Sequence, residues 1–445
     1  MENLPNGFTG FANRPDGFES AGEASRRRRA AAAGGQAAPL HYAREAASSG
    51  RKERLPFQPV ELEDGRPHES RMAWTQIDLS AIRYNVAQSR RFLQPRCRLM
   101  AVVKADAYGH GAVEVSKAAI GAGADRLAVS NVLEAVALRK AGITAPILVL
   151  SQPAKTSIPQ LLGYNIIPSV YEPDFAVSYG EVADLHGMTA PYHLAVNTGM
   201  NRIGVRYDDV VEFLHQVSFH RALELEGVYT HYATADCAET LDLQIQTKRF
   251  IDALESINAA GFDPGVVHAA NSAAAFRYPS VHFDMVRMGI ALYGLHPCPE
   301  TRNIVELMPA MSVHARICDA RPLGVSEGVS YGLHYRSPGS VKICTIPIGY
   351  ANGLRRGLSG NTDFIIGGRY VRQVGAICMD QCMFEVDMRR SAVRELIDPQ
   401  PGDEVLVVGS QGIAEITIDE MAEKLSTVNY EIACGFSQQL PRVFV

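Results

Sequence analysis

Residues 99–111 read LMAVVKADAYGHG, and this stretch indicates both the fold of the chain and its chemistry. Its first part, Leu99–Val103, is a short apolar run of the kind that forms a buried parallel strand. The run ends at Lys104, and a glycine-rich turn follows. In a parallel α/β barrel the active site lies at the carboxyl ends of the strands. A lysine there is partly desolvated, which makes it a candidate nucleophile or base.

Short apolar runs recur as far as about Ile290 and alternate with stretches of helical spacing, such as 111–123 and 131–141. The predicted strands are Leu99–Val103, Arg126–Ser130, Ile147–Ser151, Ile166–Val170, Tyr192–Asn197, Leu225–His231, Val266–Ala270 and Phe283–Arg287. Strands that alternate with helices in this way predict an α/β fold with a parallel (β/α)₈ barrel of the TIM type.

The pattern changes after Leu295, where short β-rich segments are separated by turn residues. These segments are Val341–Pro347, Phe364–Ile366, Tyr370–Val374, Cys382–Val386 and Glu404–Val408. They predict a mostly antiparallel β domain, with one helix at Ile418–Leu425. We therefore expect an N-terminal extension at 1–72, a barrel at 73–300 and a C-terminal β domain at 301–445, to which the segment before the barrel can contribute.

The first 72 residues differ in composition from the rest of the chain. They are rich in Gly, Ala, Pro, Ser and Arg and lack hydrophobic periodicity, so we predict that they are disordered. The run Arg26–Arg29 is read as part of a solvated tail, with organelle targeting or contact with an acidic surface as alternatives. Met72 stands just before the globular part, and one hypothesis is that synthesis starts there. Peptides from before Met72 in the native protein would refute it.

The composition excludes several classes of function. Lys and Arg number 43 against 48 Asp and Glu, so the net charge of −5 gives no indication of nucleic-acid binding. No apolar run approaches the roughly 18 residues that a membrane-spanning helix needs. The eight cysteines lack the paired spacing of a zinc site, so we expect no metal and reduced thiols in a cytoplasmic protein.

Motifs along the chain from Ala73 onward resemble those of the alanine racemases and occur in that family's order. Besides the Lys104 stretch, they are Trp74–Leu79, Asn197–Arg202, Thr230–Asp236, Ala270–Ala273, Val286–Ile290, Val329–Gly332, Ile346–Ala351, Cys378–Gln381 and Asn429–Glu431. The resemblance implies an isomerase that uses pyridoxal 5'-phosphate to racemise L-alanine and D-alanine. It also implies an amino acid as substrate, a homodimer with shared active sites and a role in D-alanine biosynthesis.

The resemblance assigns roles to individual residues. Lys104 resembles the lysine that carries the cofactor as a Schiff base and serves as the base on one face of the substrate. Tyr331 resembles the base on the opposite face, which a second subunit contributes. The residues that resemble the other cofactor ligands are Tyr108, His231, Ser272, Arg287, Gly289, Ile290 and Tyr430. Arg202 and Met379 resemble the residues that bind the substrate carboxylate.

These residue types suit the chemistry of racemisation. A proton must leave the α-carbon on one face and return on the other, and this carbon is too weakly acidic without an electron sink such as pyridoxal phosphate. A tyrosine has an ordinary pKa near 10 and needs nearby positive charge to act as a base. His231 and Arg287 resemble the groups that help it. Arg287 also resembles the arginine that faces the cofactor's ring nitrogen. Because arginine keeps its proton, such a contact leaves that nitrogen unprotonated, which favours racemisation over other pyridoxal chemistry.

The chain departs from the family pattern at four positions. Ala195 and Asn197 stand where many members have a carbamylated lysine and an aspartate, and we hypothesise that a chloride ion beside Asn197 supplies the missing negative charge near Arg202. Ala376 replaces an arginine common at the mouth of the site, and Asn352 replaces an aspartate. A pocket discriminates against one methylene by only about 1–3 kcal/mol. A broad-specificity racemase that accepts serine, lysine or other amino acids is therefore the alternative to one centred on alanine.

Two rival functions share parts of this architecture. A pyridoxal-dependent decarboxylase of the same fold usually has an acidic group at the ring nitrogen, and Arg287 argues against it. A non-catalytic pyridoxal phosphate carrier has the barrel alone, and the β domain with Tyr331 argues against that. The sequence leaves open whether the product serves cell-wall synthesis or a catabolic or secondary pathway.

Overall fold

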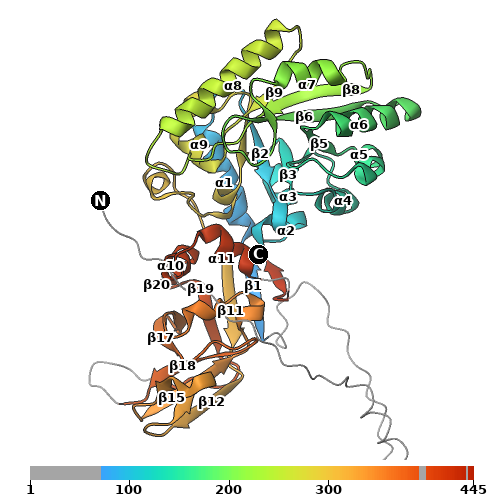
Figure 1. The fold of residues 1–445 in the computed structure, drawn as a ribbon. Helices are drawn as coiled ribbons and strands as arrows, with labels where there is room; N and C mark the ends of the chain where they lie inside the picture. The colour runs from blue at the N-terminus through green and yellow to red at the C-terminus, as the bar shows by residue number, and fades with distance from the viewer. Residues whose placement is uncertain (1–71, 390–396, 437–438) are drawn as a thin grey trace, which may run out of the picture. The chain divides into compact units, whose positions relative to one another are not determined.

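A computed structural model describes residues 72–389, 397–436 and 439–445. The predicted disorder of the N-terminal extension lies outside these residues. Within them, the strands form two large sheets and one small ribbon. The fold follows the expected change of pattern along the chain, with a parallel sheet first and a mostly antiparallel one after it (Figure 1).

The first sheet is a closed barrel that contains all eight predicted strands. They are β2 (Arg98–Val102), β3 (Arg126–Val129), β4 (Ile147–Val149), β5 (Ile167–Val170), β6 (Ala190–Asn197), β8 (Leu223–Tyr229), β9 (Val266–His268) and β10 (Met285–Met288). All neighbouring pairs are parallel, and the pairings of β10 with β2 and of β5 with β6 close the ring. The predicted (β/α)₈ barrel is thus confirmed.

Helices cover the outside of the barrel (Figure 1). They are α1 (Leu79–Phe92), α3 (Ala112–Gly121), α4 (Val132–Lys140), α5 (Ile158–Gly163), α6 (Pro173–His186), α7 (Val210–Val217), α8 (Leu241–Ala259) and α9 (Ser272–Arg277). Local sequence sets their ends. The Asn131 side chain accepts the Glu134 N–H at 3.0 Å and so caps α4. Gly187 closes α6 in the left-handed conformation that suits glycine.

The second sheet has ten strands and is mostly antiparallel, as predicted. Its members are β1 (Ala73–Ile77), β11 (Met311–Arg316), β12 (Asp319–Leu323), β15 (Val341–Ile346), β16 (Asp363–Ile366), β17 (Arg369–Val374), β18 (Cys382–Asp387), β19 (Glu404–Gln411), β20 (Ala414–Ile416) and β21 (Arg442–Phe444). Strand β1 lies between β11 and β21. The segment before the barrel therefore contributes a strand to the sheet of the C-terminal domain.

Two features of this second part bear on function. A separate ribbon of β13 (Gly328–Val329) and β14 (Tyr335–Arg336) carries the short 3₁₀ turn η5 (Tyr331–Leu333) between its strands. The helices α10 (Ile418–Lys424) and α11 (Asn429–Gly435) lie between β20 and β21 in the chain, and α11 packs against the segment that begins at Lys104.

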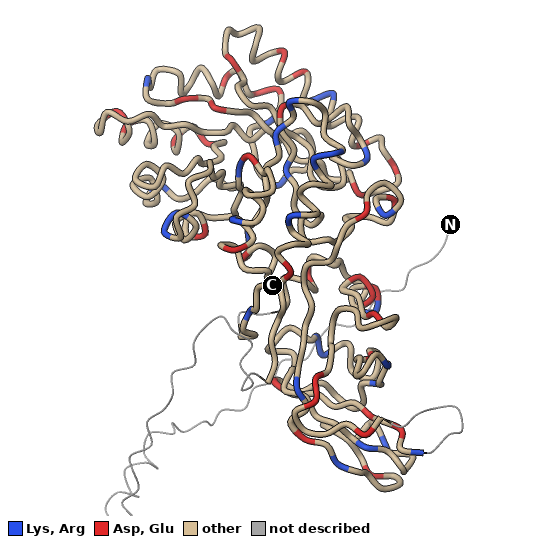
Figure 2. Tube along the Cα trace, turned by 180° about the vertical axis from the view of Figure 1, so that it is seen from behind, with Lys and Arg blue, Asp and Glu red and all other residues tan. Residues whose placement is uncertain are grey.

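Lys and Arg alternate with Asp and Glu along the trace and do not gather on one region (Figure 2). None of the helices between residues 72 and 445 that the structure describes is long and apolar enough to cross a membrane.

Candidate functional site

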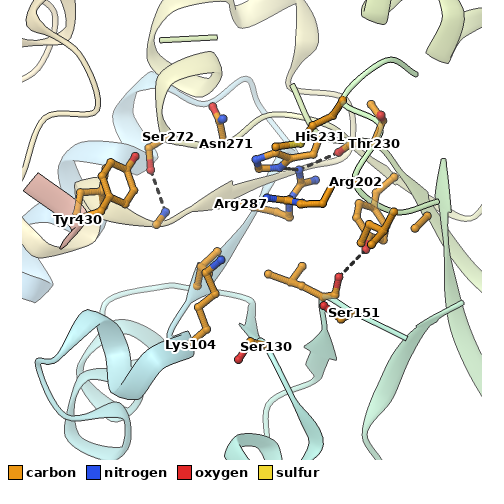
Figure 3. Close-up of a pocket in the computed structure, with 18 of the residues that line it drawn as sticks. Lys104, Ser130, Ser151, Arg202, Thr230, His231, Asn271, Ser272, Arg287 and Tyr430 are labelled. Atoms are coloured by element: carbon orange, nitrogen blue, oxygen red, sulfur yellow. Dashed lines mark hydrogen bonds between the residues drawn. The ribbon is translucent and has the colours of Figure 1, made fainter. Parts of the chain in front are cut away.

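A cavity of about 640 Å³ lies at the carboxyl ends of the barrel strands, where the chemistry of this fold is expected (Figure 3). Nine of the predicted site residues line it: Lys104, Tyr108, Arg202, His231, Ser272, Arg287, Gly289, Ile290 and Tyr430. Eight come from the barrel, and Tyr430 comes from α11. The cavity therefore brings together residues that are more than 300 positions apart in the chain.

Lys104 follows β2 after one residue, Val103, and begins a turn, α2 (Lys104–Tyr108), of unusual hand. The φ angles of Ala105, Asp106, Ala107 and Tyr108 are 52°, 53°, 53° and 53°. A left-handed conformation costs about 1–2 kcal/mol for each residue with a side chain. The turn therefore needs strong contacts with its surroundings to persist.

Those contacts come from two distant parts of the chain. The Ala105 N–H donates to the Glu134 carboxylate at 2.8 Å, on the helix that follows the next strand. Asp106 forms an ion pair of 2.8 Å with Arg442 in β21. Arg442 also donates from Nε to the Gly109 carbonyl at 2.8 Å. The turn is thus held at both of its ends, and Lys104 is fixed at the edge of the cavity.

The cavity changes the protonation of Lys104. Burial lowers the pKa of its amine below the ordinary value, and the positive charges of Arg202 and Arg287 lower it further. A lower pKa leaves more of the amine unprotonated at neutral pH, which is the form that attacks an aldehyde or accepts a proton.

One side of the cavity has the features of an anion site. Ser272 is buried, and its Oγ accepts the Gly289 N–H at 2.9 Å (Figure 3). A Cβ at Gly289 would stand 2.8 Å from the Tyr108 hydroxyl, so a side chain here would have to displace the buried Tyr108 ring. The Tyr430 ring lies 6.0 Å from that of Tyr108, centroid to centroid. Backbone N–H groups and hydroxyls gathered in this way suit a phosphate.

Arg287 forms the centre of a buried cluster and is only 3% exposed. Its guanidinium donates to the Thr230 and Ala269 carbonyls at 2.8 and 2.9 Å, and to Nδ1 of His231 and of His268 at 2.9 Å each. Because a guanidinium is only a donor, both imidazoles accept through Nδ1 and carry their proton on Nε2. Burial lowers the pKa of Arg287 to about 10, so it stays charged at neutral pH. Burial and this charge hold the pKa of both histidines well below the ordinary value.

The cluster continues through the barrel interior. His268 Nε2 lies 2.8 Å from Nδ1 of His193, and His193 Nε2 lies 3.4 Å from the Glu226 carboxylate. Glu226 pairs with Arg126 at 2.7 Å. Burial alone would raise the pKa of Glu226, but the His193 N–H and Arg126 hold it at about 2. The four hydrogen bonds that the guanidinium donates, and the His268–His193 contact behind one of its acceptors, fix the orientation of Arg287.

Sequence reasoning missed these residues as part of the site. The sequence contained a signal for them, because His193 and His268 interrupt otherwise apolar strands. A polar side chain buried at such a position needs hydrogen-bond partners. Further residues that line the cavity were also not predicted as site residues, among them Ser130, Ser151, Asn271 and Cys434.

Arg202 lines the cavity without a partner among the described residues, where it makes no hydrogen bond or ion pair. The neighbouring Asn197 is engaged elsewhere: its Oδ1 accepts the Gly199 and Asn201 N–H groups at 3.1 Å each. Ala195 lines the same wall and offers no charge. No carboxylate of the described chain therefore positions the Arg202 guanidinium.

Two predicted site residues lie outside the cavity. Tyr331 is 74% exposed in η5, and Met379 is 59% exposed in the loop before β18. Tyr350 nearby in the same domain is 41% exposed. Large apolar side chains that are exposed to solvent close to one another are typical of an interaction surface. Groups of three or more His, Cys, Asp or Glu placed to hold a metal are absent from the part of the chain that the structure describes.

Comparison with known proteins gives matches over almost all of the described chain. Residues 77–297 match the family of alanine racemase N-terminal domains, and residues 310–444 match that of alanine racemase C-terminal domains. The chain is 40% identical over 379 residues to an alanine racemase from Nostoc sp., which covers 84% of this chain and 96% of that protein. It is 39% identical to an alanine racemase from Synechocystis sp. over 84% of this chain and 99% of that one.

Solved structures give the same picture. The structure of alanine racemase from Bacillus anthracis with bound L-Ala-P is 38% identical, with a TM-score of 0.79 over 84% of this chain and 95% of that one. A histidine racemase from Leuconostoc mesenteroides is 28% identical, with a TM-score of 0.77 over 86% of this chain and all of that one.

Proposed function

This chain belongs to the alanine racemase family, and from that premise we propose that it interconverts L-alanine and D-alanine with pyridoxal phosphate by a two-base mechanism. One observation carries the proposal. A lysine with a lowered pKa shares a cavity with an anion site and a buried arginine, while a tyrosine of the same chain stands exposed in another domain.

The residues present fit pyridoxal phosphate. Ser272, Tyr108 and Tyr430, with the N–H groups of Gly289 and Ile290, would hold the phosphate, and the close approach that Gly289 allows supports this. The Gly289 N–H would then exchange its bond to Ser272 Oγ for one to the phosphate. Lys104 would bind the aldehyde carbon covalently. Arg287 would face the ring nitrogen. When bound, the cofactor supplies the electron sink that makes the α-carbon of an amino acid acidic.

The chain's own residues then handle the proton. Lys104 Nζ takes or returns the α-proton on one face of the amino acid, which its lowered pKa favours. Arg202, with its guanidinium free, binds the substrate carboxylate. Arg287 keeps its own proton, since its pKa of about 10 lies well above neutral pH. Facing the ring nitrogen of a bound cofactor, Arg287 would offer a hydrogen bond without giving up its proton, which would favour rapid return of a proton to the α-carbon.

The second base is Tyr331 from another copy of the chain. Its exposure, like that of Met379, fits a surface that completes the cavity of a neighbouring subunit in a homodimer. His231 holds its proton on Nε2, because Nδ1 accepts from Arg287. That N–H and the charge of Arg287 would stabilise the Tyr331 phenolate, which an unassisted tyrosine forms poorly at neutral pH.

A racemisation assay on a panel of amino acids tests the proposed activity. We expect alanine to be the fastest substrate, with serine and lysine slower. Serine and lysine should be accepted because Ala195 and Ala376 are smaller than the residues common at these positions in the family and carry no charge. Each L-amino acid is incubated with the protein and pyridoxal phosphate, and the enantiomers are separated by chiral chromatography. Activity confined to alanine rejects the broad-specificity alternative, for which the histidine racemase neighbour is a further argument. Absence of racemisation of any amino acid rejects the proposal itself.

A bound anion is expected beside Arg202. The guanidinium has no carboxylate partner within the described residues. Ala195 and Asn197 supply no negative charge at positions where the family often has one. We expect crystals soaked in bromide to show an anomalous peak between Asn197 and Arg202. A soak without that peak contradicts the anion, and Arg202 would then be positioned by the substrate alone.

Two rival activities have less support. A decarboxylase of the same fold would need an acid at the place that Arg287 occupies, and a cofactor carrier would have no use for Tyr331 on a second domain.

We also propose a cytoplasmic location, because all eight cysteines are free thiols, as a reducing compartment requires. The proposed division is an extension at 1–72, a barrel at 73–300 and a C-terminal domain at 301–445, to whose sheet the first residues of the barrel range contribute β1.

A further inference from the structure

The backbone just before Tyr331 is strained. Ser330 has φ 65° and ψ −177°, a region that is populated almost only by glycine. A residue with a side chain stays there only where its surroundings fix it, and such strain collects at functional sites. Here it lies at the residue that sets the direction of Tyr331.

The Ser330 side chain provides the contact that fixes it. Its hydroxyl donates a hydrogen bond of 2.6 Å to the Ala376 carbonyl and lies 3.5 Å from Cys378 Sγ. Ala376 and Cys378 belong to the loop that carries Met379. One serine thus joins the loop of Tyr331 to the loop of Met379, the two segments proposed to complete a neighbouring subunit's cavity.

Gly375 allows the two loops to approach so closely. It has φ 69°, and a Cβ at this position would stand 2.8 Å from both Ser330 Cβ and the Val329 carbonyl oxygen. A side chain at residue 375 would therefore push the loops apart and break the bond between Ser330 and Ala376.

The Met379 loop is fixed on its other side as well. The Tyr350 N–H donates to the Cys378 carbonyl at 3.0 Å, and the Ala351 N–H donates to the Met379 carbonyl at 2.8 Å. The exposed side chains of Tyr331, Tyr350 and Met379 therefore stand on segments with a fixed mutual arrangement.

We propose that Ser330 is a positioning residue for Tyr331. Its bond to the Ala376 carbonyl holds the strained backbone and sets the place of the phenol relative to the Met379 loop. The inference rests on the proposed function, in which Tyr331 is one of two bases. Ser330 itself touches neither substrate nor cofactor in this role.

The first test removes the hydroxyl and relieves the strain. Ser330→Gly suits the backbone conformation, so we expect no loss in Tm. We expect kcat for alanine racemisation to fall about 10²-fold, the effect of misplacing a catalytic group by about 1 Å. KM should change by less than about threefold. The control is Ser340→Gly, an exposed serine at φ 54° in the turn before β15, which should change neither quantity.

The second test separates the two faces of the substrate. The holoenzyme in D₂O exchanges the α-hydrogen of each enantiomer, and NMR follows the two rates independently. In Ser330→Gly, we expect slower α-hydrogen exchange of the enantiomer that Tyr331 deprotonates, in parallel with slower racemisation. The exchange rate of the enantiomer that Lys104 deprotonates should stay within about threefold of that in the unaltered chain. Equal loss on both faces, or no loss on either, overturns the inference, because a purely structural role would affect both.

A third readout needs no cofactor. Ser330→Ala keeps the strain and loses the bond, so amide hydrogen exchange over residues 328–336 should be faster than in the unaltered chain and in Ser340→Gly. Unchanged exchange overturns the proposed contact. If Ser330→Gly does not fold, Ser330→Ala decides the kinetic tests.

Tyr331→Phe in the same D₂O assay separates the inference from its premise. If that variant leaves both faces unaffected, the two-base function is wrong. If it blocks one face while both Ser330 variants leave it intact, only the positioning role is wrong.

Discussion

Replacing Lys104 with alanine is expected to lower kcat for alanine racemisation by at least about 10⁴-fold, because one side chain is proposed both to hold the cofactor and to act as a base. Its surroundings suit both tasks, since burial and Arg202 favour the unprotonated amine. Among the described residues that line the cavity, no other lysine is present to take over. We also expect the protein to lose its covalently attached pyridoxal phosphate.

The measurements are chiral chromatography of alanine and the absorbance of cofactor that remains attached after borohydride reduction followed by denaturation. Lys140→Ala, an exposed lysine on α4, is the matched control and should retain both properties. Adding a small primary amine should restore part of the activity of Lys104→Ala. Unimpaired racemisation by Lys104→Ala without added amine would contradict the whole interpretation.

Replacing Tyr331 with phenylalanine is expected to lower kcat by about 10²–10⁴-fold, the contribution of a general acid–base group. The cavity and its cofactor ligands are untouched, so bound cofactor and Tm should be unchanged. Tyr84→Phe, a half-buried tyrosine on α1, serves as the control. A Tyr331→Phe protein with full activity would exclude the second base and leave the rival functions open.

Mixing the two variants tests whether sites are shared between subunits. A dimer of one Lys104→Ala chain and one Tyr331→Phe chain has one site that lacks both groups and one that is complete. Coexpression with random pairing should therefore restore about a quarter of the normal activity, since half of the dimers are mixed and each has one complete site. No recovery would mean that both residues serve a site within a single chain.

The barrel could be predicted because its strands are buried on both faces and read as continuous apolar runs. Strand β1 was harder, because Ala73–Ile77 pairs with strands more than 230 positions later and spacing along the chain carries no information on such pairing. The weak strands β13 and β14 have only two residues each, too few for a pattern.

The cavity residues at strand ends could be predicted from their position and from the family motifs. The row from Arg287 to Glu226 could not, because it depends on the register between β6, β8, β9 and β10. The left-handed turn after Lys104 was equally hidden, since Ala105, Asp106 and Ala107 have none of the glycine that signals positive φ. Tertiary contacts from Glu134 and Arg442 impose it against local preference.

The place of β1 between β11 and β21 limits how this protein can be divided. The last residue is tied to the same strand, since the Val445 N–H donates to the Ile77 carbonyl at 3.0 Å. A fragment that begins after Leu295 would lack the strand that joins β11 to β21 and would leave the edges of both strands unpaired, which invites aggregation. The two domains are therefore unsuitable as separate modules for grafting or domain exchange unless β1 is supplied with the downstream half.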